Sequence, residues 1–531
     1  MKTKHYILLL CSLPIMLMGC KYGRDDVFNE LPRITIQHMG EVGVVPVQIF
    51  LGDTLRITPH IEYGDEGNEA FDFAWYRQDY SSLKLLSRDS IFNYKMDSLG
   101  NWTIRLEVTN KKTQVSNSST AFTTVISRSE RGWYVLKENQ EGDTELDLIG
   151  INTTGENYFN EKDLLAQWNT KLKGSPVALL YTYNYGWTAP GDSYPTTYLS
   201  TLFPVSEEDV LAFRINDEKI LAQGNDLFFD RNDHTTHHFE GGITSPLQMI
   251  LVDNKQSHLY QLGTPAFLPP AGESFQLSPY FTTTVGSTCY QLGFEETTHS
   301  FVYFNQLAAE PKFFPDNYYE GTAHISSNHM NGSIRFLENT DGSLNPDTAS
   351  VKRAYALFQE NGREDRTILL GLDLAQIDPA QYQLGNAHYS PIMTADTLSY
   401  NNYPELRTAQ YFALNKNYPI LYYGRGNTLY EYLIEQQSNR LMIQYPSNET
   451  ISYMHFVPCT YDDYTFRNLI VATTTGDGHY KIYRYTINGN QYTQLGAPYE
   501  GEGKVKTMLF ASPKTYSYNG GGWSDELYRY Y

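Results

Sequence analysis

The chain has 531 residues, more than one hydrophobic core usually organises, so we expect two or more domains. Its 60 acidic against 40 basic residues give a formal net charge of -20, which argues against the clustered positive charge that a nucleic-acid-binding surface requires. The 44 tyrosines, 26 phenylalanines and 6 tryptophans favour strands over helices, so we expect an all-β protein.

The first 19 residues have the pattern of a signal peptide. Lys2 and Lys4 precede an apolar run over residues 6–18, which is too short to stay in a bilayer as a permanent helix. The run ends in Leu-Met-Gly-Cys at residues 17–20, which resembles the bacterial lipobox, where the cysteine is acylated and the peptide is cut in front of it. We therefore expect residues 1–19 to be removed and Cys20 to anchor the protein to membrane lipid.

Residues 20–30 are polar and have no apolar pattern, so we expect them to form a tether behind the acylated cysteine. Asp25 and Asp26 in this stretch resemble the acidic signals that send lipoproteins of Bacteroidota-type bacteria to the cell exterior. We therefore expect a lipid-anchored outer-membrane protein that faces the exterior. A solvated linker would contain such residues too, so the orientation toward the inner or outer leaflet stays open.

Residues 31–128 contain strands with one apolar face and predict a β-sandwich. Apolar and polar side chains alternate from Trp102 to Val108, and residues 71–76 show the same alternation, with Trp75 on the apolar face. We expect both tryptophans to lie in the core and not to stack on a ligand. With its tryptophan followed by the strand at 100–110, this segment resembles the PKD and immunoglobulin-like modules of bacterial surface proteins, which are mostly spacers.

From residue 131 onward, an apolar or aromatic strand, a polar turn and a second strand recur at similar intervals. Examples are residues 132–136 with 146–149, and residues 419–423 with 428–432. Such repetition is typical of a β-propeller, whose four-stranded blades take about 40 to 50 residues each. We therefore expect residues 131–531 to form a β-propeller-like domain of about seven or eight blades. Stacked sandwiches are the structural alternative.

The order of these segments resembles one known family. The lipobox-like cysteine, the PKD-like segment and Gly-Trp-Tyr-Val-Leu at residues 132–136 together resemble the PKD-like family lipoproteins of Bacteroidota, which accompany Sus-type outer-membrane uptake systems. The resemblance implies an accessory of nutrient capture, with SusC/SusD-like transporter subunits and outer-membrane lipid as partners. Cys20 is the only residue whose role the resemblance transfers, and no catalytic residue comes with it.

Metal-ligating residue types concentrate at residues 230–240, with the sequence Asp-Arg-Asn-Asp-His-Thr-Thr-His-His-Phe-Glu. Their spacing matches no helix-borne HExxH arrangement, so we expect a polar loop between strands and no metal site. The acidic run at 207–209 is typical of a solvated turn. Because no P-loop, nucleophile elbow or dinucleotide fingerprint is present, we expect no cofactor and no catalytic residues. Two carboxylates brought together across a cleft, as in a glycosidase, are the alternative.

Two aromatic clusters offer flat rings with polar tips, which suit both sugar faces and peptide side chains. The first covers residues 181–187 and continues to 198, and the second covers residues 313–319. The alternating tyrosines at 181, 183 and 185 are expected to face the core, as in a strand with one buried face. The candidate ligand-binding residues are Trp187, Tyr194, Tyr198, Tyr318 and Tyr319.

Anchoring, strand repetition and aromatic loops leave two hypotheses for the function. In the first, a surface subunit captures a glycan or peptide and hands it to a TonB-dependent outer-membrane transporter. In the second, the protein is a scaffold that docks on the transporter without a ligand of its own, because tyrosine and tryptophan also anchor protein interfaces. We expect a binding protein and not an enzyme, with a surface hydrolase as the third, less favoured interpretation.

Overall fold

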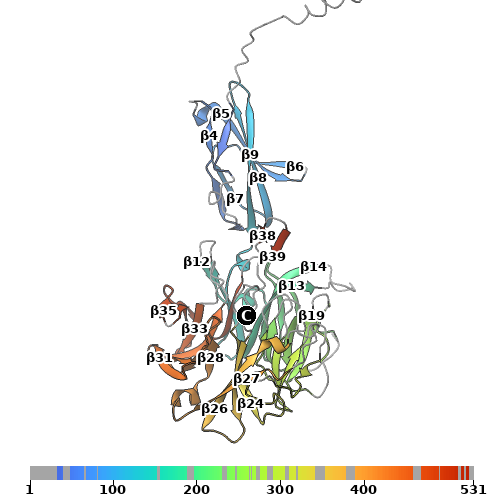
Figure 1. The fold of residues 1–531 in the computed structure, drawn as a ribbon. Helices are drawn as coiled ribbons and strands as arrows, with labels where there is room; N and C mark the ends of the chain where they lie inside the picture. The colour runs from blue at the N-terminus through green and yellow to red at the C-terminus, as the bar shows by residue number, and fades with distance from the viewer. Residues whose placement is uncertain are drawn as a thin grey trace, which may run out of the picture. The chain divides into compact units, whose positions relative to one another are not determined.

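The structure is a computed structural model, and Figure 1 shows its course. It describes residues 33–39, 48–64, 67–80, 82–151, 156–187, 197–229, 236–244, 248–261, 264, 266–270, 275–283, 291–304, 310–318, 321–340, 353–377, 389–457, 468–489, 491–511, 516–519 and 522–525. Cys20 and the expected signal peptide lie outside these residues. None of the helices within them is long and apolar enough to cross a membrane.

Strands make up most of the described residues, so the expectation of an all-β protein is confirmed. The helical segments are single turns: α2 (Leu164–Gln167) and the 3-10 turns η1 (Asn68–Ala70), η2 (Arg128–Glu130), η3 (Gly224–Leu227), η4 (Leu374–Ile377) and η5 (Pro404–Thr408). The chain divides into two compact units, Met1–Val125 and Ile126–Tyr531. This division lies close to the boundary at residue 128 that the sequence predicts.

The first unit contains a five-stranded sheet and two strand pairs (Figure 1). The sheet has the order β2-β9-β8-β5-β6, and the pairs are β1-β4 and β3-β7. The strands are β1 (Thr35–Gln37), β2 (Gln48–Phe50), β3 (Thr54–Ile57), β4 (His60–Glu62), β5 (Phe71–Asp79), β6 (Ser82–Ser87), β7 (Phe92–Lys95), β8 (Gly100–Asn110) and β9 (Ser116–Ile126). One apolar core joins the sheet to both pairs.

Alternation along the strands determines which side chains form this core. In β8 every second residue from Trp102 to Val108 is buried, and in β5 the same pattern buries Trp75. The indole N–H of Trp75 donates to the carbonyl of Asp89 at 2.8 Å, and that of Trp102 donates to the carbonyl of Ser98 at 3.0 Å. Both indoles are buried and hydrogen-bonded inside the unit, which confirms them as core residues.

The described part of the second unit contains seven sheets of three to five strands and a two-stranded hairpin. In chain order, sheet 1 is β12-β11-β10-β37, sheet 2 is β13-β14-β15-β16, sheet 3 is β17-β18-β19, sheet 4 is β20-β21-β22-β23, sheet 5 is β24-β25-β26-β27, sheet 6 is β28-β29-β30-β31, and sheet 7 is β32-β33-β34-β35 with β36 beside β34. The hairpin is β38 (Tyr516–Asn519) with β39 (Gly522–Asp525).

The strands of sheets 1 to 3 are β10 (Gly132–Glu138), β11 (Thr144–Ile151), β12 (Asn157–Glu161), β37 (Lys504–Ala511), β13 (Pro176–Trp187), β14 (Thr197–Ser206), β15 (Leu211–Arg214), β16 (Lys219–Gln223), β17 (Phe239–Thr244), β18 (Gln248–Asp253) and β19 (Gln256–Gln261). Those of sheets 4 and 5 are β20 (Thr282–Thr283), β21 (Gln291–Glu295), β22 (Ser300–Phe304), β23 (Lys312–Phe313), β24 (Gly332–Asn339), β25 (Arg353–Glu360), β26 (Arg366–Asp373) and β27 (Ile392–Ser399). Those of sheets 6 and 7 are β28 (Tyr411–Leu414), β29 (Ile420–Arg425), β30 (Thr428–Leu433), β31 (Ser438–Gln444), β32 (Glu449–Val457), β33 (Asn468–Thr475), β34 (His479–Asn488), β35 (Gln491–Gln494) and β36 (Tyr499–Glu502).

Each sheet of the second unit packs on its two neighbours. In β10, Trp133 and Val135 belong to a core cluster with sheet 7, whereas Tyr134 and Leu136 belong to a cluster with sheet 2. Because successive residues of a strand point to opposite faces, a strand that is apolar at nearly every position indicates burial on both faces. Equivalent clusters join sheets 2 and 3, 3 and 4, 4 and 5, 5 and 6, and 6 and 7.

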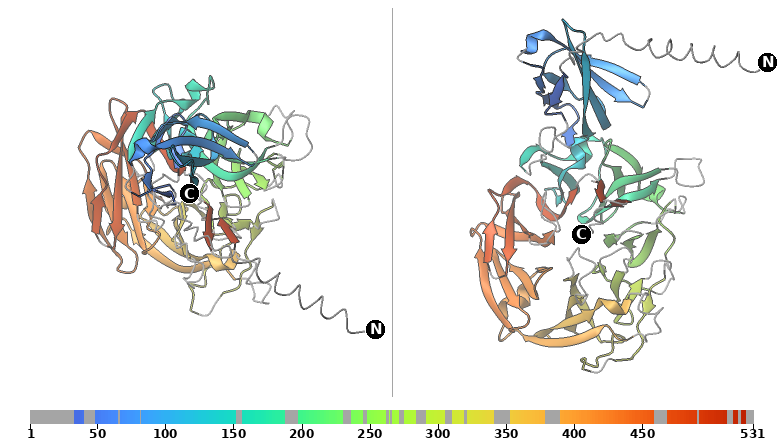
Figure 2. Two further views of the ribbon diagram at one scale, coloured as in Figure 1. Left: turned by 90° about the horizontal axis from the view of Figure 1, so that it is seen from above. Right: turned by 45° about the horizontal axis from the view of Figure 1, so that its top comes forward.

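The last strand of these sheets, β37, pairs with the first, β10. Trp133 lies opposite Phe510, and their ring centroids are 4.9 Å apart. β37 also contacts the first strands of sheets 7 and 2, which are β32 and β13, and further first strands contact one another, namely β13 with β17 and β28 with β32. The right-hand view in Figure 2 shows the sheets of this unit following one another in chain order around a common centre.

A buried carboxyl group lies in the first turn of the second unit. Ser127 caps η2, and its backbone N–H donates to the Glu130 carboxyl at 3.1 Å, which completes a capping box. Burial raises the pKa of Glu130 to about 7. Between the ordinary pKa of 4.5 and about pH 7, Glu130 is protonated in the folded protein and ionised in the unfolded chain. The unfolding free energy therefore falls as the pH rises through this range.

Glu130→Gln is expected to raise the unfolding free energy above pH 7 by roughly 3 kcal/mol at most, and to change it little near pH 4. The amide keeps an oxygen that accepts from Ser127, but it removes the cost of burying a charge. Urea unfolding of both proteins at several pH values measures this difference. An equal shift at all pH values would contradict the assignment of the pH dependence to Glu130.

Candidate functional site

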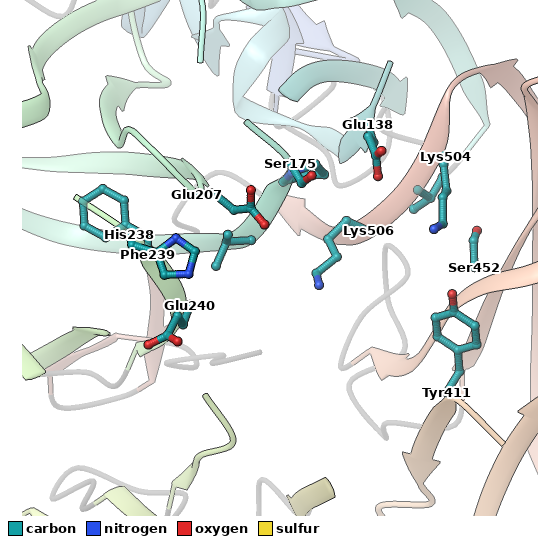
Figure 3. A pocket seen from close by; sticks show the side chains of 13 residues that line it. Glu138, Ser175, Glu207, His238, Phe239, Glu240, Tyr411, Ser452, Lys504 and Lys506 are labelled. Atoms are coloured by element: carbon teal, nitrogen blue, oxygen red, sulfur yellow. The ribbon is translucent and has the colours of Figure 1, made fainter. Parts of the chain in front are cut away.

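A cavity of about 310 Å³ lies near the beginnings of several first strands of the second unit. Its walls come from β10, β13, β17, β28, β32 and β37 and the turns beside them. The lining residues are Glu138, Ser175, Pro176, Val177, Glu207, His238, Phe239, Glu240, Tyr411, Ser452, Lys504, Val505 and Lys506 (Figure 3). The cavity therefore depends on five sheets that are distant in sequence.

Alternation along two strands brings charged groups into this cavity. In β37, Val505 is buried in the core between sheets 1 and 7, so Lys504 and Lys506 point to the opposite face. At the start of β17, Phe239 is buried in the same way, and its neighbours His238 and Glu240 also line the cavity. In both strands, burial of the central apolar residue thus fixes the direction of the two polar side chains beside it.

The cavity holds groups of both charges. Figure 3 shows the carboxylates of Glu207 and Glu240 on one side and Lys504 on the other, with Lys506 between them. Partial desolvation by the surrounding residues lowers the pKa of Lys506, and the nearby ammonium of Lys504 lowers it further, whereas Glu207 and Glu138 act in the opposite direction. Two ammonium groups beside three carboxylates suit a ligand that carries charges of both signs.

Two of the five aromatic residues that were expected to bind ligand have described side chains. Trp187 ends β13, is half-buried and packs against the core between sheets 2 and 3. Tyr318 is half-buried, and its ring stacks on His324 with 5.5 Å between the ring centroids. Neither of them lines the 310 Å³ cavity, so their role in ligand binding stays a prediction.

The other three aromatic candidates are not placed as side chains. Tyr198 belongs to β14, but its side chain is not described, and Tyr194 and Tyr319 lie outside the described residues. The expectation that alternating tyrosines face the core is confirmed for Tyr185, which is 2% exposed. Tyr181 is partly buried and packs against the core between sheets 1 and 2.

The histidine-containing segment at 230–240 is described from Thr236 onward. Its two described histidines point to different sides: His238 lines the 310 Å³ cavity, whereas His237 Nδ1 lies 2.6 Å from a carboxylate oxygen of Asp253. Among the described residues, no group of three or more His, Cys, Asp or Glu side chains could hold a metal ion. His234 lies outside those residues, so the expected absence of a metal site stays a prediction for the whole segment.

Of the charged residues of the cavity, Glu240 lies at the end of the segment 230–240 that the sequence singled out for its metal-ligating residue types, and the others were not candidates. Glu207 lies in the bend between β14 and β15, consistent with the expected turn at 207–209, and it also lines the cavity. The signal that could have found the site is Lys504-Val505-Lys506, because a strand that alternates lysine with valine places both ammonium groups on one face.

Comparison with known protein families shows a PKD-like segment in this chain. The PKD-like family matches residues 23–176, which include all strands of the first unit and extend to the start of β13. The N-terminal part of the chain is therefore PKD-like, as the resemblance predicts. No curated protein sequence matches the chain.

The solved structures that the comparison found share little sequence with the chain and have low TM-scores. A quinonprotein alcohol dehydrogenase-like protein of Bacteroides thetaiotaomicron is 12% identical, covers 88% of this chain and 96% of its own, and has a TM-score of 0.37. Hsv2 of Kluyveromyces lactis is 8% identical, covers 67% of this chain and 98% of its own, and has a TM-score of 0.30. Neither similarity is strong enough to support an argument about fold or function.

Proposed function

We propose that sheets 1 to 7 are the blades of a β-propeller. The core clusters between all neighbouring sheets, including sheets 7 and 1, support this arrangement. The pairing of β37 with β10 would close the ring, because it completes the first blade with the last strand. In a propeller the first strands of the blades surround the central axis, so the 310 Å³ cavity would be an axial site.

The function that this cavity supports best is the capture of a short peptide. The observation behind it is the presence of Lys504 and Lys506 beside three carboxylates in one open cavity. The carboxylate end of a peptide pairs with the lysines, and its amino end pairs with Glu207 or Glu240. A volume of 310 Å³ lies at the small end of the range for ligand sites, which suits the end of a chain.

The site of action follows from the lipobox-like sequence. Acylation of Cys20 would hold the protein at the outer membrane, with residues 20–30 as a tether and the cell exterior as the side of capture. A binding protein at that place serves as an accessory subunit of a TonB-dependent Sus-type complex, with SusC/SusD-like subunits as partners. The PKD-like match of the N-terminal part is consistent with this proposal.

Lys506→Met is expected to weaken peptide binding by about five-fold, because Lys506 is exposed at the cavity and an exposed charge pair contributes about 1 kcal/mol. Calorimetric titration of the purified protein with a panel of short peptides measures the affinity. The matched control is Lys312→Met, because Lys312 is exposed in β23 and lies outside the cavity. This control is expected to bind like the unchanged protein.

Peptides with an amidated C-terminus test the charge pairing directly. They are expected to bind Lys506→Met and the unchanged protein equally weakly, because the carboxylate that the lysine would contact is missing. Equal affinity for free and amidated peptides would contradict the proposal. If no peptide or glycan binds and the chain co-purifies with transporter subunits, the protein is a scaffold, and turnover of a panel member would instead identify an enzyme.

A further inference from the structure

A second cavity of about 620 Å³ opens beside sheet 3, and the two cavities share no lining residue. Part of its wall is apolar and includes Phe229, which is 62% exposed, beside Pro269 and Pro270. The rest of the wall is polar and includes Asp253 and the side-chain amide of Gln256. An exposed aromatic ring thus lies at the same cavity as several hydrogen-bonding groups.

The polar wall is rigid because Asp253 is fixed by the protein itself. Its carboxylate is 2.6 Å from His237 Nδ1, and it accepts hydrogen bonds from the backbone N–H of His238 at 2.7 Å and from Asn254 Nδ2 at 3.0 Å. The ring of His237 stacks on Phe228, with 5.0 Å between the centroids. The charge of Asp253 is therefore held within the protein, and its position does not depend on a ligand.

A tight hairpin turn positions the amides. Asn254 and Lys255 connect β18 to β19 with φ values of +50° and +62°, which is typical of a two-residue turn in which both residues are left-handed. Asp253 and Gln256 face each other across this turn. The side chain of Asn254 also donates to the carbonyl of Thr236 at 3.1 Å. The amides of Asn254 and Gln256 are thus presented to the cavity from a short, constrained turn.

The described wall of the cavity carries hydrogen-bonding groups and few charges. No lysine or arginine lines it in the part of the chain that the structure describes, and its one carboxylate is already satisfied. A side-chain amide can donate and accept a hydrogen bond, as can a sugar hydroxyl. A flat aromatic ring can cover the apolar C–H face of a pyranose ring. These features differ from those of the 310 Å³ cavity, whose charges favour a ligand with charges of both signs.

We propose that the 620 Å³ cavity binds a neutral pyranose unit of a glycan. Phe229 covers the apolar face of the sugar ring. The amide of Gln256 donates to and accepts from its hydroxyl groups, and Asn254 Oδ1 accepts from a hydroxyl, because Asn254 Nδ2 already donates to Asp253 and Thr236. The volume lies within the usual range of small-molecule sites. The assignment does not rest on the proposed capture of peptides, because the two cavities have separate walls.

Phe229→Ala is expected to weaken the binding of neutral oligosaccharides about ten-fold, because it removes the stacking surface. Saturation-transfer NMR and calorimetry measure the binding of glucose-, mannose-, galactose- and xylose-based oligosaccharides to the purified protein. The matched control is Phe122→Ala, since Phe122 is 66% exposed and lies in β9 of the first unit. Gln256→Ala is a second variant that removes an amide and is expected to weaken the same binding.

Three outcomes would overturn the assignment. These are no binding of any neutral oligosaccharide at millimolar concentration, equal losses for Phe229→Ala and Phe122→Ala, and binding of a neutral peptide in place of the sugar. Lys506→Met is expected to leave oligosaccharide binding unchanged, because Lys506 lines only the other cavity. Failure of peptide capture and failure of sugar binding are therefore distinguishable in one set of variants.

Discussion

Replacing Glu338 by alanine is expected to lower the unfolding free energy of the second unit by about 3–5 kcal/mol. The carboxylate of Glu338 in β24 accepts hydrogen bonds from the ammonium of Lys416 and from the backbone N–H of Leu414, the latter at 2.8 Å. His455 Nδ1 lies 3.4 Å from the same carboxylate. Glu338 and Lys416 are each 8% exposed, so the substitution leaves a buried ammonium without its counter-charge.

The position of this cluster explains why the effect is large. Glu338 lies in the first strand of sheet 5, Lys416 follows the first strand of sheet 6, and His455 lies in the first strand of sheet 7. Burial lowers the pKa of both Lys416 and His455, whereas the carboxylate of Glu338 raises both. The single carboxylate therefore offsets part of the desolvation of groups from two other sheets.

Scanning calorimetry measures the effect on the transition of the second unit, while the transition of the first unit is expected to stay in place. The matched control is Glu360→Ala in the same sheet, because Glu360 and Arg366 form a half-exposed ion pair whose loss is expected to cost about 1 kcal/mol or less. Combining Glu338→Leu with Lys416→Met is expected to recover most of the stability, since it removes both charges. A loss no larger for Glu338→Ala than for Glu360→Ala would contradict this account.

Local alternation predicted the strands well, because period two is a property of the residues themselves. It located β8 and the buried faces of Trp102 and Trp75, and it located β10 from Gly132 onward. It could not predict that β10 pairs with β37, because the two strands lie at opposite ends of the second unit. Such a pairing depends on how all intervening sheets pack, and no local pattern contains that information.

The candidate site could not be predicted for the same reason. Glu138, Glu207 and Lys506 come from three separate parts of the chain and meet only because the sheets bring their strand ends together. Exposed aromatic residues were a reasonable sign of ligand binding, yet neither Trp187 nor Tyr318 lines either cavity. The structure places a different aromatic residue, Phe229, at a cavity. Phe229 directly precedes the histidine-containing segment, which the sequence suggested only as a candidate for metal binding.

A substitution of Cys20 is expected to change the location of the protein without changing its fold. The matched control for Cys20 is Cys11, which lies within the expected signal peptide and would be removed with it. Cys11→Ser is therefore expected to leave acylation and membrane attachment unchanged. Protease treatment of intact cells that produce this control then shows whether the attached protein faces the exterior, as Asp25 and Asp26 suggest.

Cys20→Ser is expected to move the protein almost completely from the membrane fraction to the soluble fraction. A serine cannot form the thioether that carries the lipid. Fractionation together with labelling by a radioactive fatty acid measures both losses at once. Labelled Cys20→Ser in the membrane fraction would place the anchor elsewhere, whereas unlabelled protein that still sediments with the membrane would indicate attachment through a partner. Because Cys20 lines neither cavity, peptide and sugar binding are expected to persist in the soluble variant.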